Sequence, residues 1–96
     1  MNLELKEKDG ILNVKVIGRL DTMTAPKLEE ELSQKTDNID GIVFDLEKLD
    51  YISSTGIRIL MATRKKFDNM KVINPKDEIL EIFEMTGLTE VFNIEK

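Results

Sequence analysis

Three consecutive hydroxyl side chains, Ser53, Ser54 and Thr55, stand directly before Gly56. They follow a short apolar stretch and precede residues with helical spacing, which predicts a strand-to-helix junction. A hydroxyl at such a junction can cap the helix by accepting a hydrogen bond from a free backbone N–H group. It can also accept a phosphate, because the first turn of a helix favours an anion. Capping needs one hydroxyl, so one residue can cap while its neighbour is phosphorylated.

Catalysis by these hydroxyls is disfavoured by what the chain lacks. It contains no histidine and no cysteine, the commonest general base and the usual thiolate nucleophile. A serine nucleophile would need a lysine or a carboxylate as its base. The sequence also has no phosphate-binding glycine loop, no nucleophile elbow and no HExxH motif. We therefore expect no enzyme activity, no metal and no cofactor, with a nucleotide-binding or enzymatic domain as the less favoured alternative.

Length and charge narrow the class of protein further. The 96 residues are 41% hydrophobic and 34% charged, which predicts one globular domain, residues 1–96. The net charge of −5 disfavours a nucleic-acid partner, because such binding depends on an excess of lysine and arginine. No apolar run approaches the roughly 20 residues that span a bilayer, and the N-terminus lacks the apolar region of a signal peptide. We expect a cytoplasmic protein without a membrane partner.

The first elements that must position the hydroxyls are two strands. Polar and apolar residues alternate over Leu3–Lys8 and again over Ile11–Ile17, and Asp9-Gly10 is a turn signal between them. This pattern predicts an antiparallel N-terminal β-hairpin whose second strand ends at Gly18.

The remaining elements alternate between helix and strand. Thr24 is a predicted N-cap for a helix that begins at Ala25-Pro26 and ends before the polar run Thr36–Asp40. The further predicted elements are a buried strand at Ile42–Leu46, a helix opened by residues 53–56 and ending at Arg64–Lys66, a strand at Lys71–Ile73, a helix at Asp77–Thr86 closed by Gly87, and a short strand at Val91–Ile94. The fold class is α/β (α+β), a mixed sheet of four to five strands with about three helices mostly on one face.

The segment Leu49–Leu60, LDYISSTGIRIL, resembles the signature loop of STAS domains in bacterial anti-sigma factor antagonists. Three other segments resemble the same family in the same order. They are Gly18–Asp21 with Thr24-Ala25, the strand Ile42–Leu46, and the helix end Phe83–Leu88. The resemblance extends over nearly the whole chain and implies a STAS-like fold.

The resemblance also implies a function. In that family an anti-sigma factor that is itself a serine kinase phosphorylates the antagonist, and a PP2C-type phosphatase reverses the modification. The unphosphorylated antagonist binds the anti-sigma factor and frees a sigma factor. Matched residue by residue, the acceptor falls on Ser54, followed by Thr55 and Gly56. Ser53 replaces the aspartate that usually precedes the acceptor, so Ser53 and Thr55 remain rival acceptors.

The surface that would contact the partner is also implied by the resemblance, since the family places the loop after the second strand beside the acceptor. It comprises Asp21, Thr22, Met23, Ser53, Thr55, Gly56 and Arg58. Each has a simpler alternative: Asp21 as a turn residue, for example, or Arg58 as a solvated surface side chain. The alternative function is a STAS scaffold or adaptor with another partner, either stressosome-like or part of a lipid-transport system.

Overall fold

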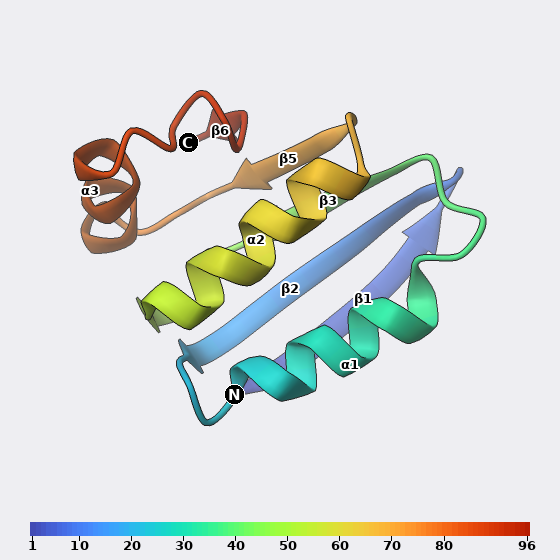
Figure 1. The fold of residues 1–96 in the computed structure, drawn as a ribbon, viewed down its shortest axis with the longest axis horizontal. Coiled ribbons are helices and arrows are strands. Elements are labelled where there is room, and N and C mark those ends of the chain that lie inside the picture. Colours follow the sequence, from blue (N-terminus) through green and yellow to red (C-terminus); the bar gives the residue numbers. More distant parts are fainter.

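The computed structural model describes residues 1–96 (Figure 1). Strands β1 (Asn2–Lys8) and β2 (Ile11–Leu20) form the predicted antiparallel hairpin. Asp9 and Gly10 turn the chain with φ values of 53° and 82°, a region that glycine and aspartate tolerate better than most residues. From Leu12 to Val16 the side chains of β2 alternate, so that every second residue is buried on one face of the sheet.

The sheet is mixed, with a single antiparallel pair at its N-terminal edge. Its order is β1-β2-β3-β5-β6, in which β3 (Gly41–Asp45), β5 (Met70–Ile73) and β6 (Ile94–Glu95) run parallel to β2. One strand lies outside this order. Strand β4 (Leu49–Ile52) pairs in parallel with the C-terminal part of β2, past the residues of β2 that pair with β3. The predicted α/β class with a mixed sheet is therefore confirmed.

Three helices complete the fold: α1 (Ala25–Lys35), α2 (Ser54–Lys66) and α3 (Asp77–Met85). Figure 1 shows α1 and α2 across one face of the sheet, while α3 lies beyond the end of β5 near the C-terminus. The core fills the space between that face and the helices. The core includes Val14, Phe44, Leu28 and Leu60, all wholly buried.

No helix combines the length and the apolar character needed to cross a membrane.

The prediction was wrong about the end of β2 and missed β4. Gly18 does not end the strand: it adopts a φ of +97°, and the register with β4 shifts between Gly18 and Arg19. Such a bulge bends a strand without ending it, and β2 continues to Leu20. The sheet consequently has six strands rather than four to five.

The C-terminal segment also differs from its prediction. The last strand is Ile94–Glu95, not Val91–Ile94, because residues 89–93 form turns in which the Phe92 N–H group donates to the Leu88 carbonyl oxygen at 3.0 Å. The Phe92 side chain is buried in the core. Its ring meets that of Phe83 edge to face, with centroids 5.3 Å apart. Gly87 follows α3 with a φ of +72°, and this confirms the predicted helix end.

Candidate functional site

Two loops meet where α2 begins. One is the connection from β2 to α1, and the other is the junction from β4 to α2 that carries the three hydroxyls. Thr22 Oγ1 and Thr55 Oγ1 lie 3.3 Å apart and share a hydrogen bond. We call residues 21–23 and 53–55 together the two-loop surface. The structure thus brings together the predicted site residues from both halves of the chain.

Ser53 is the residue that caps α2. The Gly56 N–H group donates to Ser53 Oγ at 3.3 Å, and Ser53 is half-buried in an extended conformation. Its own N–H group donates to the Leu20 carbonyl oxygen at 2.9 Å, which ties the junction to β2. The hydroxyl of Ser53 is therefore engaged in holding the helix start.

Ser54 differs from both neighbours. It is exposed as the first residue of α2, and its hydroxyl makes no hydrogen bond to the rest of the chain. Thr55 is half-buried and bonded to Thr22. Of the three hydroxyls, the one on Ser54 is thus the most exposed, and it alone makes no hydrogen bond within the chain.

Replacement of Ser53 by alanine is expected to destabilise the protein more than replacement of Ser54. Loss of an N-cap costs about 1 kcal/mol, which lowers the melting temperature of a domain this size by roughly 4–8 °C. Ser54→Ala removes no hydrogen bond, so it should stay within about 2 °C of wild type on the same scale. Thermal unfolding followed by circular dichroism measures both, and equal effects would contradict the assignment of Ser53 as the cap.

Asp21 organises the neighbouring loop. Its Oδ1 atom accepts hydrogen bonds from the N–H groups of Met23 at 3.0 Å and Thr24 at 3.1 Å. The backbone hydrogen bond from Thr24 is the main cause that holds the pKa of Asp21 below its ordinary value, although partial desolvation opposes it. The Thr24 hydroxyl, the Met23 N–H group and nearby Arg19 lower the pKa further. Asp21 thus brings a fixed negative charge to the two-loop surface at neutral pH.

Thr24 occupies the predicted N-cap position of α1, but its side chain makes no capping hydrogen bond to the helix. Its hydroxyl accepts from the Asp21 N–H group at 2.8 Å and donates to the Arg19 carbonyl oxygen at 2.8 Å. The loop bends back on itself, so the hydroxyl bonds to residues before the helix instead of to the helix. Thr24 therefore fixes the shape of the loop that carries Thr22 and Met23.

Gly56 is buried, so we revise its predicted role as a partner contact. A Cβ atom there would lie 2.8 Å from Leu20 Cγ and 2.9 Å from Ile52 Cγ1. Real Cβ atoms do not come so close to their neighbours. Glycine at this position lets α2 approach the sheet, and that approach sets where Ser54 emerges.

Sequence reasoning missed two charged groups beside this surface. The Arg19 guanidinium stacks over the Tyr51 ring, 4.3 Å from its centroid, and lies 3.6 Å from an Asp21 oxygen. Lys76, at the start of α3, forms an ion pair with Asp50 of β4. Arg19 and Tyr51 are cross-strand partners in the pairing of β2 with β4. Only the recognition of β4 would therefore have revealed the contact between Arg19 and Tyr51.

The remaining predicted contacts are exposed. The Met23 side chain is 88% exposed at the tip of its loop. Arg58 is exposed one turn into α2 and forms no ion pair within the chain. It shares a surface hollow with Ser54, which we call the Ser54 hollow. The Ser54 hollow is lined by Ser54, Ile57, Arg58, Met61, Thr86 and Leu88.

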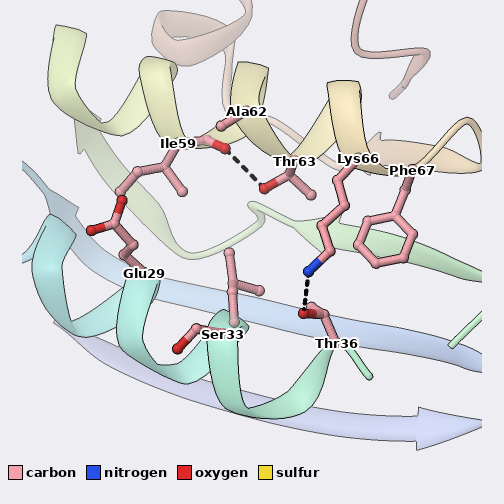
Figure 2. A pocket seen from close by; sticks show the side chains of 9 residues that line it. Glu29, Ser33, Thr36, Ile59, Ala62, Thr63, Lys66 and Phe67 are labelled. Carbon is pink, nitrogen blue, oxygen red and sulfur yellow. Dashed lines mark hydrogen bonds between the residues drawn. The ribbon is translucent and has the colours of Figure 1, made fainter. Parts of the chain in front are cut away.

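A second hollow lies between α1 and α2, towards the C-terminal ends of both helices (Figure 2). Lys66 Nζ reaches across it to donate to Thr36 Oγ1 at 3.1 Å, and the Thr63 hydroxyl donates to the Ile59 carbonyl oxygen at 2.8 Å. Its volume is about 140 Å³, below the roughly 300–1,000 Å³ of typical ligand pockets. Ser54, the predicted acceptor, does not line this hollow.

Comparison with known proteins gives consistent matches over the whole chain. The STAS domain family matches residues 2–96. The anti-sigma-B factor antagonist of Staphylococcus aureus strain NCTC 8325 is 32% identical over 99 residues, covering 98% of this chain and 92% of that protein.

Solved structures agree with this result. The crystal structure of an anti-sigma factor antagonist from Mycobacterium paratuberculosis superposes with a TM-score of 0.87 at 28% identity, covering 97% of this chain and 83% of that one. The anti-sigma factor antagonist SpoIIAA in its unphosphorylated form gives a TM-score of 0.84 at 15% identity, covering 99% and 89%. The SpoIIAA match supports the fold alone.

Proposed function

This chain belongs to the STAS domain family and to the anti-sigma factor antagonists within it, and from that premise we propose that phosphorylation of Ser54 controls its binding to an anti-sigma factor. The proposed partner is an anti-sigma factor that is also a serine kinase, and a PP2C-type phosphatase removes the phosphate. All of these partners act in the cytoplasm. The unphosphorylated protein binds the anti-sigma factor and thereby releases a sigma factor.

The observation that carries the proposal is the difference between the three hydroxyls. Ser53 Oγ accepts the capping hydrogen bond and Thr55 Oγ1 is paired with Thr22, whereas Ser54 is exposed and unbonded. A kinase needs an acceptor hydroxyl that it can reach without breaking the fold. Ser54 meets that requirement. Phosphorylation of Ser53 or Thr55 would instead disturb a hydrogen bond of the fold, to the Gly56 N–H group or to Thr22.

The mechanism needs only local electrostatics. A phosphoserine adds about −1.5 to −2 charges at pH 7, and here it would stand on the same surface as the ionised Asp21. In an interface, that cluster of negative charge must be desolvated and brought close to the partner. A loss of about 3–4 kcal/mol would weaken binding roughly 10²–10³-fold, which is sufficient for a switch.

A scaffold or adaptor role within the STAS family does not require an accessible acceptor. A lipid-transport role in particular would not require the exposed and unbonded hydroxyl of Ser54. The switch accounts for that hydroxyl, and we favour it for this reason.

Incubation with the cognate kinase and ATP is expected to add one phosphate, on Ser54. Tandem mass spectrometry of the modified protein locates it, and Ser54→Ala serves as the control that should take up no phosphate. Phosphate on Ser53 or Thr55 in the wild-type protein would contradict the choice of acceptor. An unmodified wild-type protein, in a reaction where the kinase phosphorylates a known substrate, would contradict the switch itself.

A further inference from the structure

We propose that Arg58 binds the phosphate on Ser54 within the same helix and holds it in the Ser54 hollow. This inference rests on the proposed function, because it assigns a partner to the phosphate that the switch requires. It gives Arg58 a role within the chain, in addition to any contact with the anti-sigma factor.

The spacing of the two residues favours the contact. Ser54 and Arg58 are four residues apart on α2 and line the same hollow, and residues at this spacing are neighbours on a helix surface. Helical side chains lean towards the N-terminus, so a side chain as long as that of Arg58 can reach back to a phosphate on Ser54. An acidic group placed four residues before a basic one is also the more favourable order.

The surrounding charges leave Arg58 available. The other four residues of the Ser54 hollow carry no charge. On its other side Arg58 shares a shallow hollow with Glu29 of α1, but the two form no ion pair. The neighbouring cations are already engaged, Arg19 with Asp21 and Lys76 with Asp50. Arg58 is therefore the cation that a phosphate on Ser54 would meet.

The chemistry of the two groups fits. A guanidinium presents parallel N–H donors that match two phosphate oxygens. An opposite charge nearby favours the ionised form of an acid, so the pair should lower the second pKa of the phosphoserine from its usual value of about 6. The phosphate would then carry a larger share of its dianionic form at neutral pH.

The test is a titration of protein carrying phosphoserine incorporated genetically at position 54, followed by phosphorus NMR. It needs no kinase. We expect the phosphate pKa to rise by about 0.15–0.4 pH units in Arg58→Gln, the range for the one negative charge that the second ionisation adds opposite an exposed i,i+4 cation. Arg58→Lys should restore part of the shift. Lys65→Gln removes the same charge from an exposed site farther along α2 and should leave the pKa within about 0.1 unit of wild type, since exposed charges a Debye length apart are screened.

The N-terminal end of α2 affects the phosphate pKa equally in every variant. The difference in pKa between Arg58→Gln and the wild-type side chain therefore reports the effect of Arg58 alone. An unchanged pKa in Arg58→Gln, or an equal rise in Lys65→Gln, would overturn the inference. Arg58 is exposed, and the melting temperatures of the unphosphorylated variants verify that they fold. Failure of the kinase to modify Ser54 would instead reject the proposed function, while the titration would still report on Arg58.

Discussion

Ser54→Ala is expected to bind the anti-sigma factor at least as tightly as the unmodified wild-type protein, whereas Ser54→Asp and Ser54→Glu should bind at least about tenfold more weakly. Alanine removes a hydroxyl that makes no hydrogen bond within the chain and adds no charge. A carboxylate adds one negative charge beside the ionised Asp21. It carries less charge than a phosphate, so a loss of about 1.4 kcal/mol, or tenfold in affinity, is a conservative expectation.

Isothermal titration calorimetry with the purified partner measures the three affinities. Gln34→Glu is the matched control, because it adds one negative charge at an exposed position of α1, far from the start of α2. That control should bind as wild type does. A folding defect would weaken Ser54→Ala and Ser54→Asp together, so the asymmetry between them is diagnostic. Equal affinities for Ser54→Ala and Ser54→Asp would reject an electrostatic switch at this position.

Gly56→Ala is expected to lower the melting temperature by up to roughly 15 °C, the net of overpacking and the better helix propensity of alanine. The added methyl group would lie 2.8 Å from Leu20 Cγ and 2.9 Å from Ile52 Cγ1, and both of these residues are buried. Overpacking of this kind costs about 1–3 kcal/mol, or about 4–8 °C per kcal/mol in a domain this size. Alanine is otherwise the better helix former by about 1 kcal/mol, so the sign of the effect tests the packing directly.

A double-mutant cycle with Leu20→Ala identifies the cause. Leu20→Ala removes the atoms nearest to the new methyl group, so the double variant should be less destabilised than the sum of the two single variants. Urea denaturation gives the free energies of unfolding for the cycle. Wild-type stability in Gly56→Ala would mean that α2 lies farther from the sheet than the structure places it.

Local patterns were sufficient to predict much of the fold. The alternation in β1 and β2 and the Asp9-Gly10 turn signal predicted the hairpin, because both depend only on neighbouring residues. The α1 start at Ala25 and the α3 end near Gly87 were predicted from Pro26 and from glycine's tolerance of positive φ. Such signals act over a few residues and survive in the tertiary structure.

Features set by distant contacts could not be predicted in this way. In β4 the central residues Asp50 and Tyr51 are both exposed while Leu49 and Ile52 are buried, so the strand shows no regular alternation. Its existence depends on pairing with the end of β2 beyond Gly18. That pairing also places Arg19 over Tyr51, which no local pattern indicates.

The Ser-Ser-Thr-Gly run predicted a strand-to-helix junction, which the structure contains between β4 and α2. Its family resemblance proposes a site there, yet sequence alone left the roles of Ser53, Ser54 and Thr55 open. The distinction depends on the Gly56 N–H group that selects Ser53 Oγ and on Thr22 from the other loop. Gly56 was assigned to the partner surface because burial cannot be read from a motif.

The most direct test of the switch is the affinity of the wild-type protein for its anti-sigma factor before and after stoichiometric phosphorylation of Ser54. Titration calorimetry of both forms, with phosphatase treatment of the second as the reversal control, provides the comparison. We predict tight binding by the unmodified form, a loss of roughly 10²–10³-fold on phosphorylation, and full recovery after dephosphorylation. Equal affinity of the two forms would contradict the account.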